Sequence, residues 1–235
     1  FVYVPVDRFN LVHKYVGYGP TKPRLSSLGT SGWQKQKLLT KKSTDRVVGD
    51  LIKLYASRSK PRGFVYNPDM EILSALTKSF PYKETPDQAR AIKEVLDDLK
   101  KVRPMDRLLY GDVGFGKTEV ALRAIVAVVS SGRCAFFLAP TTVLSDQHFI
   151  TCKNRLSPLG INVELLSRFR TKKDQTKILS DLKNKKIDVV VGTHRLLSND
   201  VCVKSLGLLV VDEEHRFGVK NKEKIKTLKA GVDVL

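Results

Sequence analysis

The sequence has few cysteines and no long hydrophobic run. Its three cysteines are widely separated and form no CxxC pair, which argues against a disulfide framework or a zinc knuckle and fits a reducing cytoplasm. No apolar stretch approaches the roughly 18 residues that span a bilayer, and FVYVPVDRF at the start lacks the basic-then-apolar pattern of a signal peptide. We therefore expect no membrane segment, and the missing initial Met suggests a piece of a longer protein.

Acidic residues are also scarce. The chain has 42 Lys and Arg against 24 Asp and Glu, which leaves a formal charge of +18. This excess favours a polyanionic partner, with nucleic acid first and an acidic membrane second; the alternative is a merely soluble basic surface. Residues 21–63 hold eleven Lys or Arg against two Asp, a net of nine, so half of the charge lies in that segment.

With 235 residues, 42% of them hydrophobic, the chain can form a full core, as one large domain or one domain with an appendage. Residues 1–6 predict a short strand, and Pro5 favours an edge position. Residues 17–32 are rich in Gly, Pro, Ser and Thr and predict a loop. Residues 33–59 have helical spacing among many lysines and predict one long, exposed, basic helix.

From Thr85 onward, helical patterns alternate with short apolar runs. Thr85 suits a helix cap and Pro86 the first turn of the helix that follows. Alternation of this kind predicts right-handed crossovers and an α/β fold, in which helices cover both faces of a parallel sheet. The predicted strands are RLLY (107–110), CAFFLA (134–139), VELLS (163–167), IDVVVG (187–192) and LGLLVVD (206–212).

The segment GDVGFGKT, residues 111–118, fits the phosphate-loop pattern GxxxxGK[ST] between an apolar run and an apolar helix. Gly111, Gly114 and Gly116 would let backbone N–H groups point at phosphate oxygens. Lys117 would reach the outer phosphates, and the Thr118 hydroxyl would bind Mg²⁺. The alternative is a chance glycine turn before a helix.

The segment LLVVDEEHRFGV, residues 208–219, ends a buried strand in acidic residues. In a phosphate-loop enzyme, Asp212 would hold the metal through water, and Glu213 would orient or deprotonate the attacking water. A zinc site at His215 is the weaker alternative, because HExxH needs two histidines four residues apart. The predicted catalytic set is therefore Lys117, Asp212 and Glu213.

GDVGFGKT followed by DEEH resembles the superfamily 2 helicases and translocases, whose second motif has the form DExH. The resemblance implies a RecA-like P-loop NTPase lobe with ATP and Mg²⁺ as cofactors, and it adds Phe115 and Glu119 to the nucleotide site. FPYKETPDQ, residues 80–88, resembles the adenine-reading Q motif, with Gln88 on the base edge and Phe80 against its face. Thr85 and Gln88 also fit a T-x-x-Q capping box, and the two roles are compatible.

Three further segments resemble the motifs of this superfamily that touch the phosphate backbone of the tracked strand. They are APTTVLSDQH, SRF and GTHRLL, and the alternative for each is an ordinary polar loop tip. His148, within the first segment, is expected to be a helix-surface or core residue. The DNA-binding residues that the resemblance implies are Thr141, Thr142, Gln147, Arg168, Thr193 and His194.

Four segments are similar to those of the bacterial transcription-repair coupling factors. They are GDVGFGKTEVA, SRFR and VDEEHRFGV, together with YVPVDRFNLVHKYVG upstream. That resemblance implies the end of an RNA-polymerase-interacting barrel at 1–16, a loop and basic linker helix at 17–63, and the first RecA-like translocase lobe at 64–235. It implies double-stranded DNA as a partner, with the RNA polymerase beta subunit and repair excision proteins in the full-length protein.

The sequence ends before the family's second motor lobe, which supplies an arginine for phosphoryl transfer, so poor ATP hydrolysis is expected of this chain alone. Two alternatives stay open. The chain could be the lobe of a RecG-like branch-migrating helicase, or a non-catalytic module that binds polymerase through residues 1–60.

Overall fold

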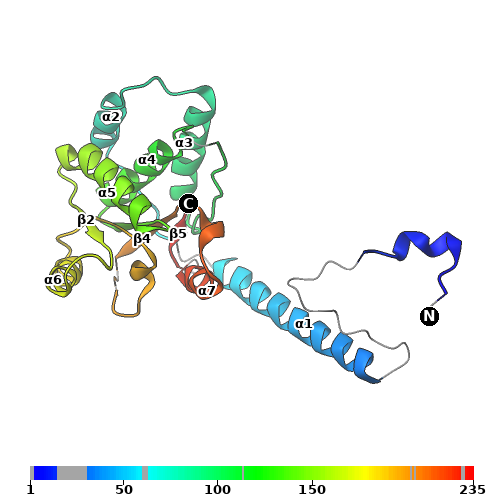
Figure 1. The fold of residues 1–235 in the computed structure, drawn as a ribbon. Coiled ribbons are helices and arrows are strands. Elements are labelled where there is room, and N and C mark those ends of the chain that lie inside the picture. The colour runs from blue at the N-terminus through cyan, green and yellow to red at the C-terminus, as the bar shows by residue number, and fades with distance from the viewer. Residues whose placement is uncertain are drawn as a thin grey trace. The chain divides into compact units, whose positions relative to one another are not determined.

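The computed structural model describes residues 3–14, 31–59, 63–112, 114–201, 203, 205–228 and 231–235. It divides into two compact units, Phe1–Leu51 and Ile52–Leu235. Figure 1 shows the helices and strands of both. In the described chain, no helix combines the length and apolar character needed to cross a membrane.

The first unit contains the 3-10 helix η1 (Val6–Leu11), and no strand occurs among residues 3–14. The predicted strand at 1–6 is therefore wrong over its described part. Arg8 N donates to Pro5 O at 3.0 Å, so the backbone turns after Pro5, and all of residues 3–14 are exposed. Residues 17–30 of the predicted loop lie outside the described residues.

The long basic helix is confirmed as α1 (Ser31–Ser59), which extends over 29 residues. Nearly every side chain that the structure describes in α1 is exposed. Lysines are among these exposed side chains, and six others are large and apolar, namely Trp33, Leu38, Leu39, Val47, Val48 and Ile52.

The second unit is built on a five-stranded parallel sheet in the order β2-β3-β1-β4-β5. The predicted parallel sheet is thus confirmed, and its chain order, with β1 in the centre, follows from crossover connections. The strands are β1 (Cys134–Leu138), β2 (Val163–Leu166), β3 (Val189–Gly192), β4 (Leu206–Val211) and β5 (Asp233–Val234).

Helices cover both faces of the sheet (Figure 1). Phe137 belongs to the apolar cluster under α2 to α5, while its neighbour Phe136 belongs to the cluster under α6 and α7. Successive strand residues point to opposite faces, so both faces of β1 are buried, as in other parallel sheets. The helices are α2 (Met70–Lys78), α3 (Pro86–Leu99), α4 (Lys117–Ser130), α5 (Thr142–Leu156), α6 (Lys172–Lys183) and α7 (Val219–Leu228).

The predicted strand at 107–110 does not form. Asp106 makes an isolated parallel bridge to Val234, and Arg107 N donates to Val234 O at 3.0 Å. Beyond that point Leu108 and Tyr110 are 87% and 94% exposed. Residues 108–110 belong to no strand in the structure.

Candidate nucleotide-binding site

The phosphate-loop segment begins helix α4 with two glycines in left-handed conformations. Gly114 has φ +82°, and Gly116, the N-cap of α4, has φ +72°. A Cβ atom at Gly116 would also collide with Nε2 of Gln88. The left-handed backbone therefore favours glycine at position 116, and a Cβ there would displace the Gln88 amide. The loop presents the helix N-terminus that favours anions.

Lys117 lies at the first position of α4 and closes the loop onto itself. Its Nζ donates to Gly111 O at 2.6 Å and to Asp112 O at 2.8 Å. Thr118 follows, half-buried. The ammonium group is thus held over the loop backbone, where phosphate oxygens would be stronger acceptors than these two carbonyls because they are charged.

Asp212 stands at the carboxyl end of β4. Its backbone N donates to Leu138 O at 2.9 Å, and its Oδ2 lies 2.9 Å from His148 Nε2. The hydrogen bond from His148 holds the pKa of the Asp212 carboxyl below its usual range, against the effect of burial, and the positive charge of Lys117 acts in the same direction. The structure therefore brings Lys117 and Asp212, from motifs far apart in the sequence, within electrostatic reach.

Glu213 follows in a left-handed conformation, with φ 49° and ψ 53°. Such a conformation is uncommon for a residue with a side chain, and it concentrates at functional sites. Arg216 Nε lies 2.6 Å from Glu213 Oε2. The Glu213 carboxylate is thus paired with Arg216, three residues further along the chain.

Gln88 connects α3 to the phosphate loop. The capping box is confirmed: Gln88 Oε1 accepts from Thr85 N at 2.9 Å, and Gln88 N donates to Thr85 Oγ1 at 3.2 Å. Its Nε2 donates to Phe115 O at 2.9 Å. Phe115 is 66% exposed, and Phe80 is half-buried, with the Arg155 guanidinium 5.4 Å from its ring centroid.

The segments that form this site lie within a region that matches a known protein family. Residues 85–233 match the model of the DEAD/DEAH box helicase family. The chain belongs to that family. The match begins at the capping threonine of α3, includes the phosphate loop and the DEEH segment, and ends in β5.

Individual relatives confirm the narrower resemblance drawn from the motifs. The chain is 50% identical over 234 residues to the transcription-repair-coupling factor of Bacillus subtilis (strain 168), and 48% identical to that of Staphylococcus aureus (strain USA300). Each comparison covers 100% of this chain and 20% of the relative, so the chain spans about one fifth of their length.

A solved structure of RecG bound to a three-way DNA junction is 40% identical to this chain, with a TM-score of 0.68. It covers 78% of this chain and 24% of the RecG chain. The second unit of this helicase-family chain is thus a RecA-like lobe, as predicted.

The expected strand-contacting residues of the helicase lobe follow the carboxyl ends of three neighbouring strands. Thr141 follows β1 and caps α5 by accepting from Leu144 N at 3.2 Å; Arg168 follows β2, and His194 follows β3, both exposed. Parallel strands bring their carboxyl ends to one edge of the sheet, which is where ligands of open α/β sheets bind. Thr142 is half-buried at the start of α5, and Gln147 is exposed further along it.

Thr193 differs from the other five expected strand contacts. It is 2% exposed, and its Oγ1 has no hydrogen-bond partner among the described residues. Its hydroxyl is therefore covered by protein in this conformation, and it does not share the open surface of Arg168 and His194.

The side chain of Glu119, expected near the nucleotide, is buried between two arginines. Glu119 is 4% exposed, and Arg155 Nη1 donates to its Oε2 at 3.0 Å while Arg123 Nε donates to its Oε1 at 2.9 Å. Position 119 lies on the part of α4 that faces α2 and α5. The Glu119 carboxylate therefore links α4 to α5 through its ion pair with Arg155.

The metal-binding chemistry of the lobe fits a magnesium ion that arrives with the nucleotide. Among the described residues, no group of three His, Cys, Asp or Glu could hold a metal by itself. His215 is exposed and has no such group around it, so the zinc alternative loses support. Thr118 and Asp212 offer a hydroxyl and an ionised carboxylate, the hard oxygen ligands that Mg²⁺ prefers alongside phosphate oxygens and water.

His148 is the functional candidate that sequence reasoning missed. It was expected on a helix surface or in the core, and the structure places it against Asp212. The decisive signal is the strand order: β1 and β4 are parallel neighbours, so the helix that leaves β1 passes the end of β4. Strand order cannot be read from the alternation of elements alone.

Proposed function

We propose that this chain is the ATP-binding half of a double-stranded DNA translocase, which in the full-length protein displaces stalled RNA polymerase and couples transcription to DNA repair. The observation that carries the proposal is a glycine-rich phosphate loop at the start of α4 and Asp212 at the carboxyl end of β4, both within the helicase-family match. Lys117 would bind the outer phosphates of ATP, Thr118 and Asp212 would hold Mg²⁺, and Glu213 would orient the attacking water.

Two features around this centre support ATP as the nucleotide. Gln88 already contacts the phosphate loop, because its Nε2 donates to the carbonyl of Phe115. An adenine that bonds to Gln88 would therefore lie next to the phosphate loop. Phe80 and Phe115 would supply the apolar contacts to the base. Magnesium, when bound, supplies charge neutralisation at the β- and γ-phosphates.

Slow turnover by the chain alone is part of this proposal. The chain spans about one fifth of its relatives and contributes one RecA-like lobe, whereas the resemblance assigns the charge-stabilising arginine to a second lobe. An arginine of this kind contributes on the order of 10³ to 10⁵ in rate in other NTPases. We expect Mg-ATP binding with very slow hydrolysis in a phosphate-release assay; robust DNA-stimulated hydrolysis would contradict the two-lobe mechanism.

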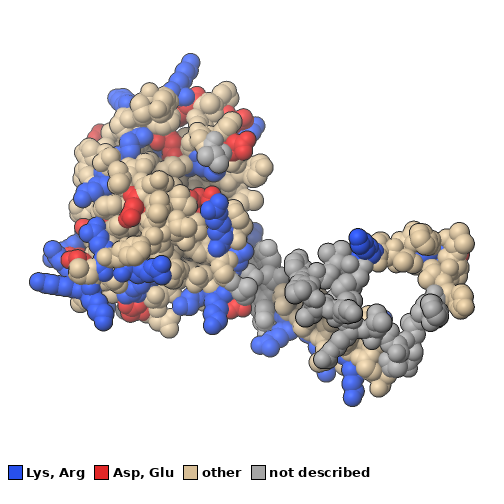
Figure 2. Space-filling view, viewed as in Figure 1, with Lys and Arg blue, Asp and Glu red and all other residues tan. Residues whose placement is uncertain are grey.

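A basic surface next to the strand ends supports DNA as the partner. Residues 168–186, which include α6, hold eight Lys or Arg against two Asp. Figure 2 shows blue side chains gathered over the part of the lobe where Figure 1 places α6. The relative solved as RecG bound to a three-way DNA junction shares the fold of this lobe.

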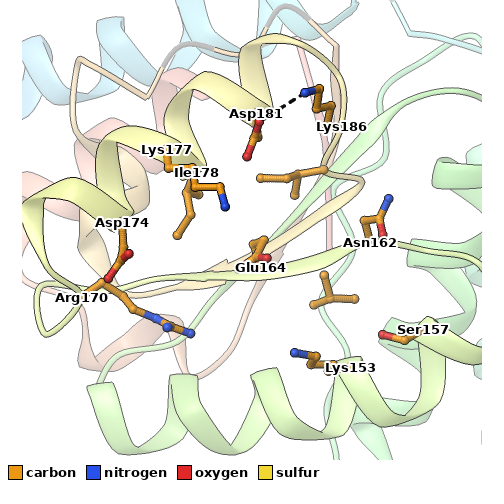
Figure 3. Close-up of a pocket in the computed structure, with 12 residues that line it drawn as sticks. Lys153, Ser157, Asn162, Glu164, Arg170, Asp174, Lys177, Ile178, Asp181 and Lys186 are labelled. Atoms are coloured by element: carbon orange, nitrogen blue, oxygen red, sulfur yellow. Dashed lines mark ion pairs between the residues drawn. The ribbon is translucent and has the colours of Figure 1, made fainter.

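This basic surface is hollowed by a groove of about 480 Å³ between α5, β2 and α6. Figure 3 shows that Lys153, Arg170 and Lys177 line it from opposite sides, with Glu164 between them. Lys186 lies 3.8 Å from Asp181, whereas no ion pair involves Lys153, Arg170 or Lys177 among the described residues. We propose that these cations extend the phosphate contacts of Arg168 along the duplex.

Duplex binding should fall steeply between about 50 and 200 mM salt, because phosphate contacts release counterions. Replacing Lys173 and Lys177 by Glu should weaken binding and lower the salt slope by about one for each lysine–phosphate interaction removed. Fluorescence anisotropy with two unrelated duplex sequences measures both quantities. Lys93→Glu on α3 with Lys100→Glu at the C-cap of that helix makes the same change in charge and serves as the control; equal losses of affinity in both pairs would refute a role for this surface.

A RecG-like branch-migrating activity is the enzymatic alternative, and it is supported by the 40% identity to the RecG structure. The upstream sequence of the parent protein distinguishes the two enzymes: a barrel would indicate the coupling factor, and a wedge domain would indicate the RecG-like helicase. The non-catalytic alternative uses the exposed apolar side chains of the first unit, among them Tyr3, Val6 and Phe9. Retention of RNA polymerase beta subunit by residues 1–60 would support that alternative.

We also propose a cytoplasmic location for the full-length protein. Cys134 and Cys152 are free and buried. Burial, joined by the charge of Asp188, raises the pKa of Cys134 to about 12, and burial raises the pKa of Cys152 to about 12. Both thiols therefore stay protonated and unreactive, which suits packing in a reducing compartment.

A further inference from the structure

Helix α5 carries a histidine that contacts the carboxylate proposed to hold magnesium. His148 Nε2 lies 2.9 Å from Asp212 Oδ2, and the two side chains are 16% and 26% exposed. The imidazole lies against the ring of Phe137, with centroids 4.4 Å apart and an interplanar angle of 32°. Phe137 is in β1, and the next residue, Leu138, accepts the backbone N–H of Asp212.

The contact fixes which carboxylate oxygen remains for the metal. An ionised Asp only accepts hydrogen bonds, so His148 Nε2 donates to Oδ2. The ring of Phe137 holds the imidazole on one side, and the bond between Asp212 N and Leu138 O holds the backbone of the carboxylate. His148 does not contact Oδ1, so Oδ1 would be the oxygen available to a magnesium-bound water.

The same helix begins at the expected strand contacts. Thr141 caps α5 and Thr142 is its first residue. His148 lies seven residues after Thr141, which is about two helical turns or roughly 10 Å along one helix face. A hydrogen-bonded helix transmits displacement of its first turn along its axis, so movement of Thr141 would reach the imidazole.

We infer that His148 is a positioning residue, which orients Asp212 for the magnesium-bound water and couples nucleic-acid binding at the start of α5 to that carboxylate. The inference rests on the proposed function and deepens it. Outer-shell partners of metal ligands typically change metal affinity or activity by about 10- to 100-fold when they are replaced. We expect a change of that order here.

Two substitutions separate positioning from packing. His148→Phe keeps an aromatic ring against Phe137 and removes the N–H donor, while His148→Gln keeps an N–H near the position of Nε2. ATP affinity is measured by fluorescent-nucleotide titration with Mg²⁺ and with EDTA. Mg²⁺ should raise the ATP affinity of His148→Phe about tenfold less than it raises that of the native chain. The affinity of His148→Phe in EDTA should be unchanged. His148→Gln should recover most of the effect of Mg²⁺.

The control is Asn154→Ala on the exposed part of α5, which should behave as the native chain in both conditions. Thermal melts establish that each variant is folded. An unchanged Mg²⁺-dependent gain in folded His148→Phe would overturn the inference and leave the proposed function standing. A native chain whose ATP binding has no Mg²⁺ dependence would instead refute the proposed function, and this inference with it.

The coupling is tested by the affinity for Mg-ATP with and without saturating duplex DNA. In the native chain the two affinities should differ, and binding linkage requires that Mg-ATP change the affinity for DNA by the same factor. In His148→Phe the difference should disappear while DNA affinity without nucleotide stays native. Equal coupling in the native chain and His148→Phe, or none in the native chain, would refute the transmitting role.

Discussion

Lys117→Ala should weaken binding of Mg-ATP by about a hundredfold. The Lys117 ammonium group is half-buried and already held over the phosphate loop by two carbonyl acceptors. Phosphate oxygens would replace these acceptors with charge-assisted hydrogen bonds, which contribute about 1.5 to 3 kcal/mol each. Since about 1.4 kcal/mol corresponds to a tenfold change in affinity, the loss of this group removes most of the measurable binding.

Titration calorimetry with a non-hydrolysable ATP analogue and Mg²⁺ measures this loss. Lys93→Ala removes the same charge from an exposed position on α3 and should bind as the native chain does. Lys117→Arg keeps the charge but needs more room inside the loop, so an intermediate affinity is expected. Affinity within about twofold of native for Lys117→Ala would remove the phosphate-loop assignment.

Glu119→Ala should lower the free energy of unfolding by about 3 to 5 kcal/mol, the usual effect of removing one partner from a buried ion pair. The Glu119 carboxylate accepts from Arg123 at 2.9 Å and from Arg155 at 3.0 and 3.1 Å. Arg123 also bonds Glu84 at 2.7 Å and contacts Thr77. Without Glu119, Arg155 has no carboxylate partner among the described residues and Arg123 keeps only that of Glu84.

Thermal unfolding measures the effect, and a domain of this size loses about 2 to 4 °C of Tm for each kcal/mol. Glu71→Ala, at an exposed position on α2, is the matched control and should change Tm by little. ATP affinity of folded Glu119→Ala at low temperature should remain near native, because the carboxylate is turned to the arginines. A native Tm together with lost ATP binding would instead return Glu119 to the nucleotide site.

The sheet could be predicted from the sequence because its strands are buried on both faces and read as short apolar runs between helices. CAFFL and LGLLVV became β1 and β4 in this way. The run RLLY has the same apolar character, but its pairing is limited to the bridge at Asp106 and the hydrogen bond from Arg107 N to Val234 O.

The candidate site could be predicted where one local pattern fixes the geometry. Glycine spacing fixes the phosphate loop, and Thr85 with Gln88 fixes the capping box. Glu119 and His148 depend instead on the order of the strands and on the helix faces that meet. These are tertiary facts, so adjacency to the phosphate loop did not indicate the arginine partners of Glu119, and a helical position did not indicate the contact between His148 and Asp212.

The most direct measurement is a crystal structure of this chain with Mg²⁺ and a non-hydrolysable ATP analogue. We expect one magnesium ion between the β- and γ-phosphates, with the Thr118 hydroxyl as a ligand and Asp212 Oδ1 hydrogen-bonded to one of its waters. Lys117 Nζ should have moved from the carbonyls of Gly111 and Asp112 to the phosphates. A bound nucleotide whose magnesium lies beyond the reach of Asp212 would contradict the convergence of the two motifs on one triphosphate.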